Sequence, residues 1–539
     1  MTYDLIITNA RIIDGAGNPW FLGAVAVAEG RIAAIGRQGS GDNGVGYNGV
    51  WANGITAQTE VVDAGGRYVC PGFVDTHTHS DFSFFVDPTA QSKVRQGVTT
   101  EITGNCGSSA APWMGAGRRT EVASGFEPIW TTMAEYIEAL DGVGKTLHIA
   151  PLVGHGTLRG AVIGREDRPG TEDELVEMER LLRESLRAGA VGMSLGLYFA
   201  PGMYAPREEL LRLMRIVAEE GKLTAAHIRD EGTYTVGFRA AVEEFISLGE
   251  ESRCPVHISH LKAHGPEVWG ISTQILELIS RARARGVQVT ADQYPWDASG
   301  GGLIPDTLPH SFQAGRSPEE ISRDLQDPQV RGELHDAVAA AIERRGGAER
   351  LFMSTYPDEA VLGRTIADLA LDYGFDAADM VMDLLARSGG GRASWTCFSM
   401  DSEDVERFMR YPTVMIGSDG SSLSIEGPLS KGTPHPRNYA TFPRVLGHYV
   451  RDRGVLGLVD AVRKMTSLPA QTFGLSERGL LATGYHADLI LFDLSQITFA
   501  TYLNPKRYPT GIDDVMVGGQ WVIREGAFTG ALPGAALRA

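Results

Sequence analysis

Short apolar, β-rich runs at both ends of the chain predict β-strands. Turn dipeptides such as Asp14-Gly15 and Glu29-Gly30 separate these runs. Because two β-rich ends can complete one sheet when the middle of the chain folds back, we predict a small discontinuous β-sandwich-like domain from residues 1–70 and 471–539. The Gly/Asn/Ser-rich stretch 36–59 predicts a long loop. The strand-like runs are 4–8, 10–14, 23–28, 31–35, 60–70, 487–493 and 515–524.

Between these ends, residues 71–470 alternate apolar runs with amphipathic stretches such as 172–188 and 207–220. This alternation is typical of βαβ units with a parallel sheet, so we predict an α/β fold, a (β/α)8 TIM-type barrel. Polar residues repeatedly follow the apolar runs, at the face on which such barrels carry their chemistry. The apolar runs are 150–154, 191–195, 223–227, 255–260, 288–292 and 413–419.

One segment, about 298–346, interrupts the barrel rhythm. It begins with a glycine run and continues through Ser317-Pro-Glu-Glu. This is the signature of a helix start, with Ser317 as N-cap, proline in the first turn and Glu320 completing a capping box. We predict an insertion here, which is either a lid over the site or a solvent-exposed decoration; the pattern favours neither.

Composition and charge narrow the classes of function. The 539 residues carry a formal net charge of -18 without a Lys/Arg-rich block, so we expect no nucleic-acid partner. Four scattered cysteines are too few for a disulfide framework, which favours a reducing compartment. The sequence has no signal-peptide pattern at its start and no apolar run of about 18 residues. We therefore expect a cytoplasmic enzyme without a membrane partner; homo-oligomer formation stays open.

The strongest candidate for chemistry is the segment Val74-Asp-Thr-His77-Thr-His79. On a strand, residues two apart point to the same side, so His77 and His79 project together, as two imidazole ligands of one cation must. Packing alone is the alternative, but two buried imidazoles without partners would be costly. The pair therefore predicts a metal site.

Cys106 follows the next β-rich run, in Glu101-Ile-Thr-Gly-Asn-Cys106-Gly. The flanking Gly104 and Gly107 allow a tight turn that presents the thiol at a strand end. A free cysteine is more often an inert core residue, but its position one strand after the histidine pair favours a zinc ligand.

Two further runs end in histidines. His227 closes 223–227, while His257 and His260 lie three apart, so they point to opposite sides of a strand. We predict that His260, nearer the strand end, faces the site and that His257 is structural. Asp230 and Glu231 are interpreted as surface groups or as partners that orient His227.

Asp419 ends the run 413–419 between glycines. A lone aspartate there is usually a turn former, but here it would be the last inward carboxylate of the barrel. Together these residues predict metal-assisted hydrolysis. A zinc ion would lower the pKa of its bound water from about 15.7 toward about 7, and Asp419 would pass the water proton to the leaving amine. No phosphate loop, dinucleotide fingerprint or nucleophile elbow competes with this interpretation.

At these residues the chain resembles the amidohydrolase superfamily, and within it the N-acyl-D-amino-acid deacylases (D-aminoacylases). The resemblance covers nearly the whole length. The cysteine in GNCG is its specific part, because hydantoinases and dihydroorotases bridge their metals with a modified lysine instead. The motifs that carry it are DLIITNARIIDGAGNP, PGFVDTHTHSD, GNCG, HIRDE, ISHLK, DQYPW, IGSDG, ADLILFDL and PGAALR.

The resemblance implies roles for these positions, beginning with one tightly bound Zn2+ on Cys106, His227 and His260. His77 and His79 would form a weaker or vacant second site, and Asp419 would be the general base and acid. It also implies a pocket for the carboxylate of an N-acyl-D-amino acid, formed by Lys262, Tyr294 and Arg437. An arginine suits a planar carboxylate; without the family context, Arg437 would be interpreted as part of a loop salt bridge.

One departure bears on the substrate. Family members that select D-glutamate are expected to carry an added arginine shortly after the YP motif. Here no Lys or Arg occurs from Asp297 to Gly315, so we predict a preference for neutral or apolar D-side chains.

Two alternatives remain open. The same metal site could serve another linear or cyclic amide, because fold and metal do not fix the substrate. A barrel that has lost catalysis and acts as a binding protein is the non-enzyme alternative, against which the complete set of candidate ligands argues.

Overall fold

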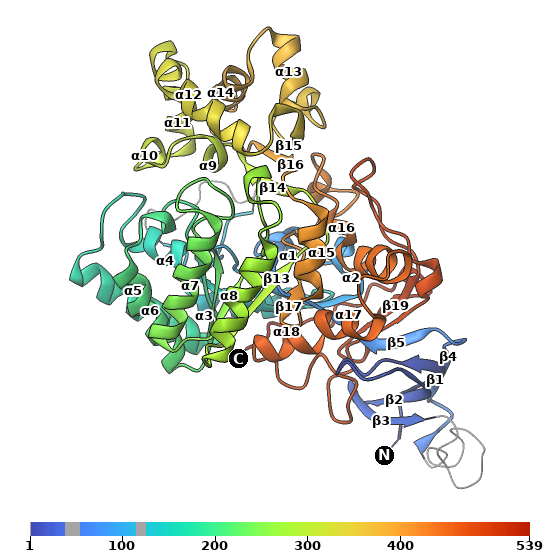
Figure 1. The fold of residues 1–539 in the computed structure, drawn as a ribbon. Coiled ribbons are helices and arrows are strands. Elements are labelled where there is room, and N and C mark those ends of the chain that lie inside the picture. The colour runs from blue at the N-terminus through green and yellow to red at the C-terminus, as the bar shows by residue number, and fades with distance from the viewer. Residues whose placement is uncertain (1, 38–53, 115–125, 539) are drawn as a thin grey trace.

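The computed structural model describes residues 2–37, 54–114 and 126–538 (Figure 1). Most of the loop predicted at 36–59 lies outside the described residues. No helix in these three ranges is long and apolar enough to cross a membrane.

The two β-rich ends of the chain lie in one sheet. Its order is β21-β20-β19-β18-β5-β1-β2-β3, and β4 pairs with β1. The central contact is antiparallel, between β5 and β18, with Cys70 opposite Ile490. The domain bounds 1–70 and 471–539 stay a prediction. The strands are β1 (Leu5–Ile12), β2 (Phe21–Ala28), β3 (Arg31–Arg37), β4 (Glu60–Asp63), β5 (Tyr68–Pro71), β18 (Leu489–Phe492), β19 (Ile512–Val517), β20 (Gln520–Arg524) and β21 (Ala527–Phe528).

The middle of the chain forms the predicted parallel barrel. One arc runs β6-β7-β8 and the other β17-β13-β12-β11-β10-β9. Only Leu152 separates β8 from β9, and a parallel bridge between Thr78 and Gly420 joins the remaining sides. The strands are β6 (Phe73–Asp75), β7 (Val98–Thr103), β8 (His148–Pro151), β9 (Val153–Gly154), β10 (Gly192–Gly196), β11 (Leu223–His227), β12 (Val256–Ile258), β13 (Val289–Gln293) and β17 (Val414–Ile416).

Helices surround these strands (Figure 1). The helix predicted at 172–188 is confirmed; Thr171 and Glu174 form a reciprocal capping box at its start, and Gly189 follows its end. The helices are α1 (Ser83–Val86), α2 (Gln91–Val94), α3 (Met133–Gly142), α4 (His155–Val162), α5 (Glu172–Ala188), α6 (Arg207–Glu219), α7 (Phe238–Ser252), α8 (Ser272–Ala284), α15 (Ser402–Arg410), α16 (Arg437–Arg444), α17 (Leu458–Met465) and α18 (Ser467–Thr472), with a π-helical segment η8 (Val445–Asp452).

An inserted unit separates β13 from β17 and stands at the top of Figure 1. It has its own sheet, β14-β16-β15, and its own apolar core. It extends beyond the predicted bound of 346, because β15 and β16 come later in the chain. Ser317 and Glu320 form the predicted capping box. Its elements are β14 (Ser299–Gly302), α9 (Leu303–Thr307), α10 (His310–Gln313), α11 (Pro318–Asp324), α12 (Pro328–Arg344), β15 (Leu351–Thr355), α13 (Ile366–Tyr373), α14 (Ala377–Arg387) and β16 (Ser394–Cys397).

The contact between the chain ends yields a stability prediction. Leu491 lies fully buried in the core of the shared sheet, opposite Val69. Leu491→Ala should lower the free energy of unfolding by about 2–5 kcal/mol, because it removes buried methyl groups and leaves a cavity. The shift of the urea-unfolding transition measures this effect. Leu371→Ala is the matched control, since Leu371 is 82% exposed; equal shifts for both variants would contradict the prediction.

Candidate active site

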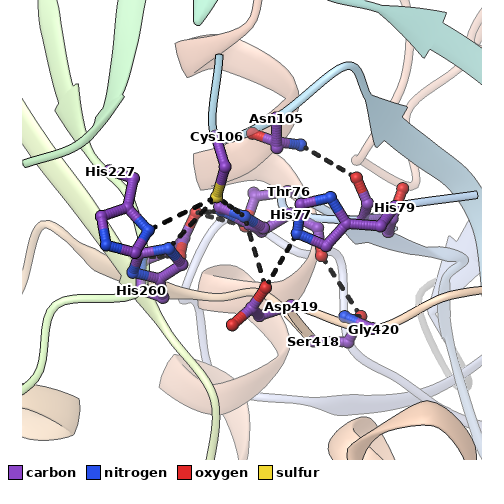
Figure 2. Close-up of polar contacts among 12 residues, drawn as sticks. Thr76, His77, His79, Asn105, Cys106, His227, His260, Ser418, Asp419 and Gly420 are labelled. Atoms are coloured by element: carbon purple, nitrogen blue, oxygen red, sulfur yellow. Dashed lines mark hydrogen bonds and ion pairs between the residues drawn. The ribbon is translucent and has the colours of Figure 1, made fainter. Parts of the chain in front are cut away.

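The predicted site residues meet where the barrel strands end (Figure 2). His77 and His79 follow β6, Cys106 follows β7, His227 ends β11, and Asp419 follows β17. The two histidines lie just beyond β6 rather than on it, because the strand ends at Asp75. Their rings nevertheless stand 5.4 Å apart, so the pair converges as expected.

Cys106 lies at the centre of the cluster. Its Sγ is 3.3 Å from His77 Nε2, 3.3 Å from His260 Nε2 and 3.7 Å from His227 Nδ1. A tight turn presents the thiol, with Gly107 at φ +73° and so close to β10 that a Cβ there would lie 2.5 Å from the backbone nitrogen of Gly196. A glycine is therefore required directly after the cysteine.

The charges in this cluster depend on one another. Burial alone would raise the pKa of Cys106, but the imidazolium charges of His77 and His260 hold it well below its usual value. Burial lowers the pKa of His227, which favours the neutral imidazole that a metal requires. The lowered pKa of Cys106 therefore favours the thiolate in the metal-free protein.

Asp419 lies on the other side of His77 and His79. Its Oδ1 is 3.1 Å from His79 Nε2 and 3.6 Å from His77 Nε2, and its Oδ2 accepts a 2.8 Å hydrogen bond from Arg437 Nη1. Although burial opposes it, the Arg437 charge keeps the pKa of Asp419 well below its usual range. The pKa of His79, which burial lowers, rises to about 9 chiefly through its hydrogen bonds to Asp419 and Cys106.

These side chains form two overlapping groups with the composition of metal sites. In each group the candidate ligand atoms all lie within 4.8 Å of one another, and Cys106 belongs to both. Thiolate and imidazole are the donors that zinc prefers, so the residues fit that ion. The groups are Cys106, His227 and His260, and His77, His79, Cys106 and Asp419.

Two carboxylates orient the histidines. Glu231 Oε1 lies 2.8 Å from His260 Nδ1, and its Oε2 lies 3.6 Å from His227 Nε2. The sequence suggested an orienting role for Asp230 as well, but Asp230 accepts backbone N–H groups of the following loop instead. Asp292, which sequence reasoning missed, accepts from the backbone N–H of His260 at 2.7 Å. The sequence feature that could have revealed Asp292 is its position at the polar end of the apolar run 288–292.

His257 is engaged away from the cluster, as expected for a structural residue. Its Nε2 lies 2.7 Å from Asp292 Oδ2, and its Nδ1 lies 2.9 Å from the hydroxyl of Thr290. The side chain of His260 points toward Cys106 instead, because His260 lies beyond the end of β12, at φ +35°.

The three candidate substrate-binding residues also lie together. The Lys262 ammonium is 5.8 Å from the centre of the Tyr294 ring, and the Arg437 guanidinium is 4.9 Å from it. All three side chains are buried, and the Tyr294 hydroxyl has no hydrogen-bond partner in the described part of the chain. Lys262 is paired with Glu231 and Arg437 with Asp419, so the group offers an anionic ligand the Tyr294 hydroxyl and the remaining N–H donors of the two cations.

Three of the nine non-glycine residues that have positive φ in the described part of the chain lie at this site. Cys106, His260 and Asp419 all adopt positive φ, at +53°, +35° and +48°. Such conformations cost an estimated 1–3 kcal/mol each for residues other than glycine, and they cluster at functional sites where the surrounding structure enforces them.

Comparison with known proteins agrees with this site. A family model described as the amidohydrolase family matches residues 60–523. An N-acyl-D-glutamate deacylase of Alcaligenes xylosoxydans xylosoxydans is 35% identical over 96% of this chain and 93% of its own. A D-aminoacylase of the same organism is 34% identical over 99% of this chain and 97% of its own. The crystal structure of an N-acyl-D-glutamate deacylase from Bordetella bronchiseptica, with zinc and a phosphonate mimic of the tetrahedral intermediate, superposes with a TM-score of 0.82, at 34% identity over 100% of both chains.

Fold, site and matches define a metal-dependent amidohydrolase that acts on C–N bonds other than peptide bonds. Within that class the chain belongs to the N-acyl-D-amino-acid deacylase (D-aminoacylase) family.

The charge state of Cys106 can be measured directly. Because its pKa is lowered, the metal-free protein should show ultraviolet thiolate absorbance already at about pH 6, where an ordinary cysteine is protonated. Burial raises the pKa of Cys254 to about 11 and that of Cys397 to about 12, so neither contributes there. The signal should vanish in Cys106→Ala. Absorbance that rises only above about pH 8 would contradict the assignment.

Proposed function

We propose that this protein is a zinc-dependent deacylase that hydrolyses N-acyl-D-amino acids to a carboxylate and a free D-amino acid. One observation carries the proposal: the half-buried sulfur of Cys106 lies within 3.7 Å of three imidazole nitrogens, beside the Asp419 carboxylate. The deacylases among its relatives support the substrate class.

The proposed tight zinc ligands are Cys106, His227 and His260, with His77 and His79 beside Asp419 as a second, weaker site. When bound, zinc supplies a Lewis acid that polarises a carbonyl oxygen and lowers the pKa of water. The contacts of Glu231 with His260 and His227 support this assignment, because such partners fix the orientation of ligand imidazoles.

Asp419 is the proposed proton carrier. It would accept a proton from the attacking water and deliver it to the nitrogen of the leaving amine, which is otherwise a poor leaving group. Its low pKa keeps it ionised and ready to accept at neutral pH. Its hydrogen bond to Arg437 holds the carboxylate in place.

Lys262, Tyr294 and Arg437 are the proposed carboxylate pocket. Their convergence on the Tyr294 ring would fix one end of the substrate while the amide lies toward Cys106. Two fixed points leave rotation about the axis between them, so discrimination between D and L forms also requires a third contact, with the side chain of the substrate.

A cavity of about 430 Å³ between barrel and insertion is suited to the side chain of the substrate. Tyr198, in its wall, stacks on His227 with ring centres 5.5 Å apart, which places the cavity beside the proposed zinc ligands. The buried Arg345 is already engaged, with Nη2 2.8 Å from the Tyr198 hydroxyl and 3.4 Å from Asp306 Oδ1. Arg344 lines the same cavity but is partly exposed, where solvent and salt weaken ion pairing. These features favour neutral or apolar D-side chains.

The substrate class can be tested with paired N-acetyl-D- and L-amino acids, with zinc measured on the same sample. We expect kcat/KM for N-acetyl-D-Leu or D-Phe to exceed that for N-acetyl-D-Glu by roughly 10- to 100-fold, because Arg345 is already paired and Arg344 is partly exposed. A preference for N-acetyl-D-Glu would contradict the predicted preference for neutral or apolar side chains. Hydrolysis of hydantoin or dihydroorotate in place of every N-acyl-D-amino acid would contradict the deacylase assignment.

The role of Asp419 gives a second test. Asp419→Asn should lower kcat by about 10²- to 10⁴-fold, since it removes the proton acceptor. Zinc at the tight site should stay bound, because Cys106, His227 and His260 are unchanged. Asp336→Asn, on the exposed surface of the insertion, is the matched control. A wild-type kcat in the zinc-loaded Asp419→Asn protein would refute the role.

A further inference from the structure

Lys93 is a lysine with no exposed surface, and neither group of candidate ligands includes it. It lies in the short helix α2, between β6 and β7. Its ammonium donates to Asp75 Oδ2 at 2.8 Å and to Ser418 Oγ at 2.5 Å, and it lies 3.6 Å from Glu101 Oε1. A charge buried this completely costs several kcal/mol unless it is paired with good geometry, so these contacts require an explanation.

Two of these partners lie directly beside the catalytic segments. Asp75 is the last residue of β6, two residues before His77, and Ser418 immediately precedes Asp419. Asp75 Oδ1 accepts from the backbone N–H of Ser418 at 2.8 Å and from that of His77 at 3.4 Å. Lys93 and Asp75 together therefore join the end of β6 to the turn after β17.

The Ser418 hydroxyl extends this connection. It donates to the carbonyl oxygen of His77 at 3.3 Å and accepts from the N–H of Gly420 at 3.1 Å. The same carbonyl of His77 accepts from the N–H of Asp419 at 2.8 Å. Figure 2 shows Ser418, Asp419 and Gly420 together beside His77 and His79. The turn is thus held from both of its flanks.

The backbone of Asp419 needs such support. Its φ of +48° lies in the left-handed region, which aspartate adopts less readily than glycine, and a relaxed turn would carry the carboxylate away from His79. Further along, Ser422 donates to Glu101 and its N–H donates to Ser80, so the segment after Asp419 is fixed to the same base.

We propose that Lys93 is a positioning residue for the deacylase reaction, whose buried ammonium fixes the strained turn that carries Asp419 against the segment that carries His77 and His79. It acts through Ser418 and Asp75 and touches neither substrate nor ligand. This proposal rests on the proposed role of Asp419.

The test compares Lys93→Met with Ser418→Ala and with a matched control. Met has a similar length without the charge, whereas Ser418→Ala leaves the Lys93–Asp75 pair intact and removes only the hydroxyl that joins it to His77. Lys464→Met is the control, because Lys464 is equally buried and binds the carbonyl of Val414 at the opposite end of β17.

We expect both test variants to lose about 10- to 100-fold in kcat, the usual effect of removing a partner behind a functional group. KM should change less than about 2-fold, because the carboxylate pocket is untouched. The double variant should be no slower than Lys93→Met, since both act through one connection. Activities are taken per bound zinc, so that partial metal loss does not imitate the effect, and Lys464→Met should keep the wild-type kcat.

Hydrogen exchange supplies a readout independent of any substrate. Amide exchange in the peptide 417–422 should accelerate in Lys93→Met and Ser418→Ala, but not in Lys464→Met. Wild-type exchange and kcat in Ser418→Ala would overturn the proposal, even if Lys93→Met failed to fold. If the wild-type enzyme hydrolysed no N-acyl-D-amino acid while exchange accelerated as expected, the proposed function would fail and the positioning of the turn would stand.

Discussion

A thiolate buried in a protein is strongly unfavourable unless positive charge or hydrogen-bond donors surround it. Here the half-buried Cys106 sulfur is surrounded by imidazoles from the ends of three other strands. The requirement to satisfy this one anion explains why residues almost two hundred positions apart converge. It also explains why glycines occupy the turn, since a side chain at Gly107 would drive the cysteine away from β10.

Around this centre the carboxylates alternate with cations. Glu231 lies between His260 and Lys262, and Asp419 lies between His79 and Arg437. Each charge is thus compensated locally, which allows a dense group of ionised side chains to remain buried. The arrangement holds side chains in conformations that an isolated turn would not adopt, and the positive φ angles of Cys106, His260 and Asp419 record that constraint. The site is therefore organised before any ligand arrives.

Sequence reasoning identified the residues whose signal is local. His77 and His79 are two apart, Cys106 lies between glycines, and Asp419 ends an apolar run, so each could be found from its neighbours alone. The roles of Asp292 and Lys93 could not be found in this way, because they exist only through contacts with partners 18 to 325 positions distant. The extent of the insertion was underestimated for a similar reason: β15 and β16 become part of it only by pairing with each other and with β14.

The pairing of β5 with β18 has a consequence for folding during synthesis on the ribosome. Cys70 finds its partner Ile490 only after 420 further residues have been added, which takes roughly 20 to 80 s at ordinary rates of synthesis. Throughout that interval the edge of β5 is an unpaired row of amide and carbonyl groups, the kind of edge that recruits foreign strands. The nascent chain therefore exposes the unpaired edge of β5 until β18 has been synthesised. Its vulnerability to aggregation is set by the speed of translation as much as by the stability of the finished fold.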